Sequence, residues 1–286
     1  MNAAPKGIFL NQLAGTVASG VDGWQPLSPH RAGLWWLALA DAPDDVWSRW
    51  ATALDDDERA RAARFVFARD RHQFIAAHAL LRLLLQELAG GPAAAWRFAS
   101  GSHGKPALHP DHRLPRLAFN ISHTRGAVAC AMTLDHDIGV DIEDLERPGR
   151  LLEIAHAYFA PDELIVLRGA PPATQRTVFF RLWTLKEAYI KAHGDGLSLP
   201  LDRFAFSLSP PRIAFAPGFP DDAAAWQFST LAATATHILS VAVRHGGTNT
   251  VAVAPHRVTH FDIDRLMAAT AVDNALPAGQ PIGWRL

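Results

Sequence analysis

The stretch FFRLWTLKEAYIKAHGDGLSLPL, residues Phe179–Leu201, combines a helical period with a high density of charge. Its side chains recur at the three- and four-residue spacings that bring them onto one stripe of a helix. That stripe comprises Trp183, Lys186, Glu187, Ile190 and Lys191. One interpretation is a solvated helix with an ordinary ion pair between Glu187 and Lys191, worth roughly 0.3 kcal/mol. The other is a helix that presents charged groups to a site, and the rest of the chain decides between the two.

The composition describes a globular protein with no strong net field. The 286 residues include 27 basic and 28 acidic side chains, which leave a formal net charge of −1. This balance gives no reason to expect nucleic acid or an anionic membrane as a partner. The single cysteine, Cys130, can form no internal disulfide, and no apolar run approaches the roughly 18 residues of a membrane span. We expect a cytoplasmic monomer.

The order of predicted elements occurs twice along the chain. The first series has a buried strand, a helical region and short strands, at residues 34–40, 44–89, 96–99, 117–121 and 127–134. The second has a strand, a long helical stretch and further strands, at 138–145, 146–196, 204–208, 226–231 and 238–244. No repeat is visible in the residues themselves. The order nevertheless predicts two similar α+β halves that meet near residues 135–138.

Four segments follow from this reading of the chain. Residues 1–32 form an N-terminal extension with no sustained period, 33–136 the N-terminal half and 137–246 the C-terminal half. Residues 247–286 form a C-terminal tail, in which one further strand is expected at 250–254. Neither terminal segment contributes to the predicted site.

Two carboxylates share one face of the strand that begins at residue 138. Strand alternation turns Asp141 and Glu143 to one side and the apolar residues between them to the other. On an exposed face these would be an ordinary solvated pair. In a cleft, with Glu187 as a third carboxylate, they would offer hard oxygen ligands to Mg²⁺. The residues alone leave both interpretations open.

Other polar groups suit phosphate but also have plain structural interpretations. The loop Gly101–Pro106 places two glycines around Lys105, which fits a bound phosphate or a simple Gly-Pro turn. Ser122 and His123 stand where a strand opens into a loop, a common place for functional residues. Arg61 lies on a helix face where a guanidinium can bind phosphate or remain solvated.

Taken together, these segments resemble the 4'-phosphopantetheinyl transferases of the surfactin-synthetase-activating (Sfp) type. The family pattern of Gly-Val/Ile-Asp and Trp-x-x-Lys-Glu-Ala/Ser-x-x-Lys stands at Gly139–Asp141 and Trp183–Lys191. Its Gly-Lys-Pro, Phe-Asn-Ile-Ser-His and Gly-Leu-Ser-Leu-Pro motifs stand at Gly104–Pro106, Phe119–His123 and Gly196–Pro200. Each motif alone is weak, but the set in this order and spacing is highly specific. The resemblance runs from about Leu34 to Arg244.

The resemblance implies an α+β fold in which two similar α/β halves are related by a pseudo-twofold axis. Each half would have a small, mainly antiparallel sheet packed on helices, with coenzyme A in the cleft between them. The implied reaction is a Mg²⁺-dependent transfer of 4'-phosphopantetheine from coenzyme A to a serine of an apo carrier, with release of 3',5'-ADP. Acyl, peptidyl or aryl carriers of fatty-acid, polyketide or non-ribosomal peptide synthases would be the partners. The alternative is a non-catalytic protein of the same fold that binds a nucleotide or a carrier.

The resemblance also assigns roles to the matched residues at the reaction centre. Asp141, Glu143 and Glu187 would hold Mg²⁺, and Glu187 would be the general base unless a metal-bound water relays the proton. Lys191 would contact the transferring phosphate. Lys186 would steady the leaving group or the carrier's serine.

Further roles concern the nucleotide and the carrier. Lys105 and Ser122 would frame the adenine, while His123 and Arg61 would bind the 3'-phosphate. The family often has a second basic residue one turn before the position of Arg61, where this chain has Glu58. The segment from Arg147 through Phe159 and Leu164 would meet the carrier, unless its apolar residues belong to the core.

Overall fold

The fold is built from two long helices and two main sheets, which position the site. The computed structural model describes residues 18–19, 24, 26–40, 42–100, 105–112, 116–247 and 250–273. The helices are α1 (Val46–Trp50), α2 (Asp56–Ala63), α3 (Ala68–Ala89), α4 (Leu151–Tyr158), α5 (Pro161–Gly169), α6 (Pro172–His193) and α7 (His260–Asp273). The strands are β1 (Ala18–Ser19), β2 (Arg31–Ala38), β3 (Phe98–Ser100), β4 (Pro106–Leu108), β5 (Leu117–Thr124), β6 (Ala127–Leu134), β7 (Asp137–Asp144), β8 (Phe204–Leu208), β9 (Pro211–Phe215), β10 (Trp226–Ala232), β11 (His237–Arg244) and β12 (Ala252–Val258).

The two halves of the chain repeat one topology. The first runs β2, α1 to α3, the β3–β4 hairpin, β5 and β6, and its strands lie in the order β2-β6-β5. The second runs β7, α4 to α6, the β8–β9 hairpin, β10 and β11, and its strands lie in the order β7-β11-β10. The neighbours within each set of three are antiparallel. The predicted pseudo-twofold α+β fold is therefore confirmed, although the sequence did not predict the short strands β4 and β9.

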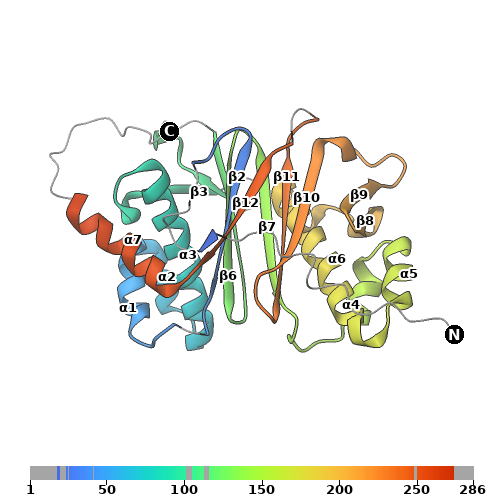
Figure 1. Ribbon diagram of the computed structural model, residues 1–286, viewed down its shortest axis with the longest axis horizontal. Helices are drawn as coiled ribbons and strands as arrows, with labels where there is room; N and C mark the ends of the chain where they lie inside the picture. The colour runs from blue at the N-terminus through green and yellow to red at the C-terminus, as the bar shows by residue number, and fades with distance from the viewer. Residues whose placement is uncertain are drawn as a thin grey trace.

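The layers run helix, sheet, sheet, helix, with the two sheets in the middle (Figure 1). Helix α3 packs on β5 and β6, and α6 packs on β7 and β11. One apolar cluster lies around each long helix, and a third joins the inner faces of the two sheets. The alternating residues of β7 belong to this third cluster through Ile138, Val140 and Ile142. Asp141 and Glu143 consequently face the helix α6 side.

The C-terminal segment returns to the first half. Strand β12 pairs in parallel with β2 and extends the first sheet, beside which α7 packs against α3 (Figure 1). Ile263 and Leu266 of α7 are buried, and Asp264 accepts hydrogen bonds from Arg49 and from Trp50 Nε1. The sequence predicted a strand in this region but no ordered helix after it. Because α7 is stabilised by contacts made across more than 200 residues, its local pattern gave little sign of it.

Strands β5 and β7 are the sheet edges that adjoin at the seam between the halves. Side chains make the connection: Asn120 Oδ1 accepts a hydrogen bond from the Val140 amide at 2.9 Å, and Ser122 Oγ accepts one from the Ile142 amide at 3.4 Å. The polar residues of β5 thus satisfy the free edge of β7, as unpaired strand edges require.

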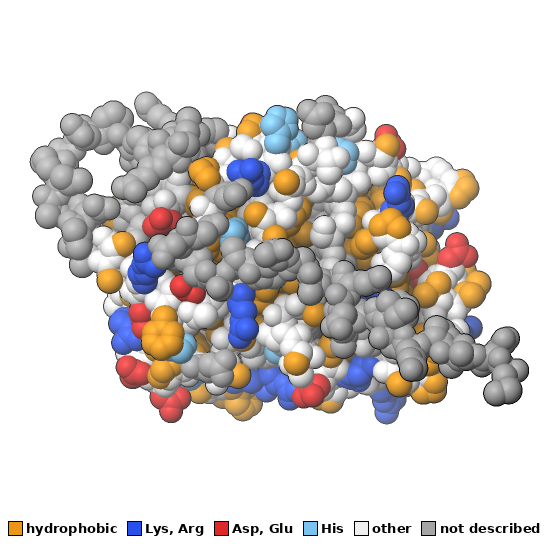
Figure 2. Space-filling model, viewed as in Figure 1, with side chains coloured by type: hydrophobic (Ala, Val, Ile, Leu, Met, Phe, Trp, Pro, Cys, Tyr) orange, Lys and Arg blue, Asp and Glu red, His pale blue; other side chains and the backbone are white. Residues whose placement is uncertain are grey.

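The distribution of charged side chains on the surface agrees with the balanced composition. Basic and acidic side chains are interspersed over the face shown in Figure 2 rather than separated by sign. None of the helices in the described part of the chain has the length and apolar character needed to span a membrane.

Candidate active site

A glycine allows α6 to lie unusually close to β7. A Cβ atom added to Gly139 would stand 2.1 Å from the carbonyl oxygen of Ala188 and 2.4 Å from the amide nitrogen of Ala192. No side chain other than hydrogen fits between this strand and this helix. Glu187 and Lys191 each precede one of these alanines on α6. The close approach therefore brings them to the face of β7 that carries the strand carboxylates.

Asp141 is the centre of this cluster. The residue is 5% exposed, and its Oδ1 accepts hydrogen bonds from Lys191 Nζ at 2.6 Å and from Ser122 Oγ at 2.9 Å. Lys191 also donates to Ser122 Oγ at 3.0 Å, so three elements meet at one point. The Oδ2 atom is buried and has no hydrogen-bond partner within the described residues. A buried carboxylate oxygen without a donor is costly, and a bound cation would satisfy it.

Glu143 lies two residues further along the same face. Its Oε2 accepts a hydrogen bond from Thr124 Oγ1 at 3.1 Å, and its Oε1 pairs with Arg147 at 2.7 Å. Burial, and then the negative charge of Asp141, raise the pKa of the Glu143 carboxyl, which Arg147 partly opposes. Thr124 had no predicted role, although it continues the alternation of Asn120 and Ser122 along β5.

Glu187 completes the set of carboxylates from the helix. Burial and then the charge of Asp141 raise the pKa of Glu187 to about 7, with a further contribution from Glu143 and an opposing one from Lys191. The three carboxylates therefore lie within electrostatic range of one another. In the described part of the chain, however, the side chains as they stand do not converge on a common point as a set of metal ligands. Their charge and the orphaned Asp141 oxygen fit a divalent cation, whereas the engagement of Glu143 by Arg147 works against one.

Lys186 does not belong to this cluster, and its ammonium lies away from the carboxylates that it was predicted to accompany. The side chain is fully buried and pairs with Glu163 Oε2 at 2.8 Å. It also donates to the carbonyl oxygens of Leu201 and Phe204, each at 2.7 Å. These partners lie on the opposite side of α6, towards α5 and β8, so the predicted single stripe of charges is split between two faces. Lys186 is a structural residue because all its bonds are made within the core.

Lys105 connects the two elements behind the cluster. Its ammonium donates to the carbonyl oxygens of Ile138 at 3.2 Å and of Ala192 at 3.0 Å, which ties the start of β7 to the last turn of α6. Burial lowers the pKa of this lysine. The preceding residues of the predicted phosphate loop, 101–104, lie outside the described part of the chain. The predicted contact of Lys105 with adenine stays a prediction.

Arg61 and His123 both lie near residues of α3. The His123 ring is accessible to solvent, yet the surrounding protein lowers its pKa, and the nearby charges of Lys191 and His78 act in the same direction. His78 stacks on Phe74 with 4.0 Å between the ring centroids. The Arg61 guanidinium lies over the Phe74 ring, 5.2 Å from its centroid. Arg61 is exposed and makes no ion pair with any described residue. Arg61 thus lies over the stacked rings of Phe74 and His78, whereas His123 lies within electrostatic range of His78 and Lys191.

Comparison with known proteins shows the family of the chain. The model of the 4'-phosphopantetheinyl transferase superfamily matches residues 137–242, and that of the 4'-phosphopantetheinyl transferase N-terminal region matches residues 41–134. The 4'-phosphopantetheinyl transferase HetI of Nostoc sp. is 34% identical over 226 residues, which cover 77% of this chain and 93% of HetI. The chain belongs to the 4'-phosphopantetheinyl transferase superfamily.

Two further relatives of this transferase cover less of it. The 4'-phosphopantetheinyl transferase Sfp of Bacillus subtilis is 34% identical over 160 residues, 56% of this chain and 69% of Sfp. The human L-aminoadipate-semialdehyde dehydrogenase-phosphopantetheinyl transferase is 33% identical over 172 residues, 57% of this chain and 56% of the relative. The two family models divide between residues 134 and 137, where β6 ends and β7 begins.

The contacts of Glu58 account for the departure of this transferase from the family pattern at that position. The Glu58 carboxylate accepts a hydrogen bond from Arg82 Nε at 2.6 Å and contacts His78 Nδ1 at 2.8 Å. Arg82 is fully buried, so Glu58 serves as its counter-ion and orients His78 beneath Phe74. The Glu58 carboxylate is therefore engaged by side chains of α3.

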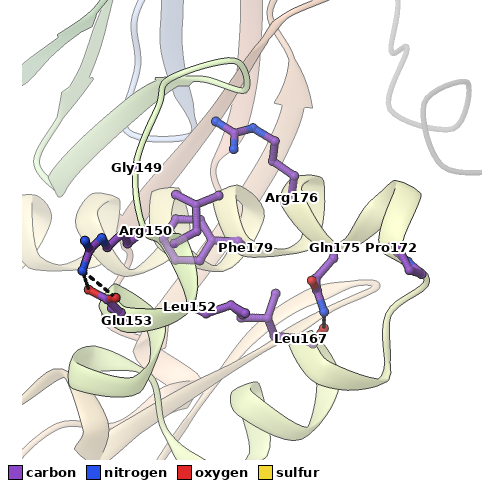
Figure 3. A pocket seen from close by; sticks show the side chains of 10 residues that line it. Gly149, Arg150, Leu152, Glu153, Leu167, Pro172, Gln175, Arg176 and Phe179 are labelled. Atoms are coloured by element: carbon purple, nitrogen blue, oxygen red, sulfur yellow. Dashed lines mark hydrogen bonds and ion pairs between the residues drawn. The ribbon is translucent and has the colours of Figure 1, made fainter.

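The segment expected to meet the carrier divides into core and surface. Phe159 is 3% exposed and belongs to the core around α6, and Leu164 is half-buried against the same core. Just beyond the predicted segment, Ile165 on α5 is 69% exposed. Other exposed apolar side chains of α4 and α5 are Leu152, Tyr158 and Val166. Behind α4 lies a cavity of about 370 Å³, in which Phe179 stands between Arg150, paired with Glu153, and Arg176 (Figure 3).

Proposed function

We propose that this transferase moves the 4'-phosphopantetheine group of coenzyme A onto a serine of an apo carrier protein. The serine oxygen forms a bond to the β-phosphorus of coenzyme A, the bond from that phosphorus to the bridging oxygen breaks, and 3',5'-ADP leaves. The observation that carries the proposal is the meeting of Glu187, Asp141 and Lys191 where α6 crosses β7, beside the polar edge of β5. An acid cluster with a resident lysine suits a reaction in which charged phosphates must be held and a hydroxyl deprotonated.

Mg²⁺ is the proposed ion of this site. Asp141, Glu143 and Glu187 would hold it, supported by the Asp141 Oδ2 atom, which has no partner among the described residues, and by the burial and then the mutual repulsion that raise the pKa of Glu143 and Glu187. When bound, the ion would neutralise charge on the pyrophosphate.

Glu187 and Lys191 would act directly on the reacting groups. Without the ion, burial and then the charge of Asp141 raise the pKa of Glu187 to about 7, and we assign the serine proton to this carboxylate. Lys191 already shares its ammonium between Asp141 and Ser122, so it is held in place to donate to a phosphate oxygen. Such preorganisation lowers the cost of reaching the transition state.

The nucleotide end of coenzyme A would lie along β5 towards α3. Arg61 and His123 would bind the 3'-phosphate, since both are exposed, Arg61 lies over the Phe74 ring, and His123 lies within electrostatic range of His78, which stacks on that ring. Lys105 and Ser122 would frame the adenine. The exposed apolar side chains of α4 and α5 would contact an acyl, peptidyl or aryl carrier of a fatty-acid, polyketide or non-ribosomal peptide synthase. The protein would act as a monomer in the cytoplasm.

Intact-mass measurement on a panel of apo carriers tests the proposal. With coenzyme A and Mg²⁺, at least one carrier should gain the mass of one phosphopantetheine on its serine. Asp141→Ala should abolish the gain, whereas the matched change Asp44→Ala, at an exposed position just before α1, should not. A panel of acyl, peptidyl and aryl carriers in which none gains mass would refute the proposed function.

A further inference from the structure

Arg147 forms an ion pair with Glu143, one of the three carboxylates of the acid cluster. Its guanidinium binds Glu143 Oε1 at 2.7 Å, while Thr124 takes the other oxygen. The Arg147 side chain is 51% exposed and Glu143 is 10% exposed, so the pair lies at the boundary between the cluster and the solvent. As long as this pair persists, Glu143 cannot turn both oxygens towards Asp141 and Glu187.

The arginine is anchored by its backbone and free to move at its tip. The Arg147 amide donates to the Asp144 carbonyl at 3.0 Å, and its own carbonyl accepts from the Arg176 guanidinium. The side chain therefore starts from a fixed point on the loop between β7 and α4. Half of that side chain faces solvent, so the guanidinium can leave Glu143 for another partner without crossing the core.

The surface beside Arg147 shows which partner could take it. Arg168 is exposed on α5, three residues after the exposed Ile165, and Arg150, which pairs with Glu153, is exposed two residues before Leu152. Basic groups around exposed apolar residues complement a protein surface that presents carboxylates around apolar side chains. A carrier with such a surface would offer Arg147 a carboxylate in place of Glu143.

We propose that Arg147 is a positioning residue that withholds Glu143 from the metal site until an acidic carrier surface docks on α4 and α5 and draws the arginine away. The proposal rests on the proposed function, because it takes the carrier as partner. One carboxylate oxygen cannot serve the guanidinium and a metal ion fully at the same time, so the two compete. Carrier binding and metal binding then favour each other by the same factor.

The experiment measures metal affinity instead of turnover. Mn²⁺, a hard cation that prefers the same oxygen ligands, is titrated into the coenzyme A-saturated protein and followed by the electron paramagnetic resonance signal of the free ion. Arg147→Gln is compared with wild type and with Arg125→Gln. Arg125 is a close control because it is also 51% exposed and pairs at 2.7 Å with the adjacent carboxylate, Asp144.

Without a carrier, Arg147→Gln should bind Mn²⁺ about three- to fivefold more tightly than wild type, given the strength of partly exposed ion pairs, and Arg125→Gln should match wild type. A carrier whose acceptor serine is replaced by alanine should tighten wild-type Mn²⁺ binding by a similar factor and leave Arg147→Gln unchanged. Equal or weaker binding by Arg147→Gln overturns the competition with Glu143. A wild-type affinity that the carrier does not alter overturns the coupling.

The two proposals fail in different ways. If no carrier gains mass in the panel, the proposed function is wrong, yet the carrier-free comparison of Arg147→Gln with Arg125→Gln still tests the competition. If a carrier is modified but that comparison shows no difference, the transfer function stands and the role of Arg147 is wrong.

Discussion

Gly139→Ala tests whether the close approach of α6 to β7 builds the site. The added Cβ would lie 2.1 Å from the Ala188 oxygen and 2.4 Å from the Ala192 nitrogen, where ordinary contacts are 3.4–4 Å. Both obstacles are backbone atoms, so no side-chain rotation relieves the clash. The helix would have to move by about 1 Å to restore tolerable contacts.

The cost of that movement follows from the packing around α6. Forcing extra atoms into a well-packed core costs about 1–3 kcal/mol, and the upper end applies here because a whole helix must shift. The smaller entropy of the unfolded alanine chain returns only about 0.5 kcal/mol. We expect the free energy of unfolding to fall by about 2 kcal/mol. A displacement of about 1 Å at Glu187 and Lys191 should also lower the rate of transfer about 100-fold.

Guanidinium unfolding and kcat for carrier modification measure the two effects. Gly169→Ala is the control, because a Cβ at that position of α5 meets nothing within 4 Å. It should leave kcat unchanged and the free energy of unfolding unchanged or slightly higher. If Gly139→Ala unfolds within about 0.5 kcal/mol of wild type and transfers at the wild-type rate, the argument that this glycine sets the site geometry is refuted.

Three further predictions concern single side chains. Lys186→Met leaves the Glu163 carboxylate buried without its cation, so the free energy of unfolding should fall by about 3–5 kcal/mol, and adding Glu163→Gln should recover part of this loss. The kcat of the folded fraction should be nearly unchanged. A lost kcat at full stability would restore Lys186 to the catalytic group. Glu187→Gln should abolish transfer. Because the pKa of Glu187 is raised to about 7, the folded protein binds the proton of this carboxyl more tightly than the unfolded chain does. Without metal, the free energy of unfolding of wild type should therefore fall more than that of the variant as pH rises from 4.5 to 7. Parallel stability curves would contradict the raised pKa. Arg61→Ala should raise KM for coenzyme A roughly 10- to 100-fold and leave KM for 3'-dephospho-coenzyme A almost unaltered; equal effects on both would place Arg61 away from the 3'-phosphate.

The sequence by itself determined the duplicated order of elements and the residues of the acid cluster. Strand alternation alone places Asp141 and Glu143 on one face of β7, because successive side chains in a strand point to opposite sides. The same alternation turns the apolar residues of β7 to the opposite face, where they lie in the interface between the two sheets. The ordered motifs then indicated that Glu187 and Lys191 return to this strand.

The tertiary structure alone decided the place of the C-terminal segment and the partners of the polar residues on β5. Strand β12 and α7 complete the first half, far from it in sequence. Local patterns carry no record of pairing at this separation, because the stabilising contacts come from distant residues. The same holds for Thr124, whose partner Glu143 lies across the seam between the halves.

Lys186 and Glu187 show most directly how far helical spacing can predict the position of a side chain. They are neighbours on α6, yet one joins a buried ion pair with Glu163 and the other lies by Asp141. Helical spacing fixes the angle between side chains, but α6 is buried on several sides, so its hydrophobic pattern does not say which face meets the strand. That choice was made by the missing side chain of Gly139, which lets β7 approach the face bearing Ala188 and Ala192, and by Glu163, which holds Lys186 on the other side.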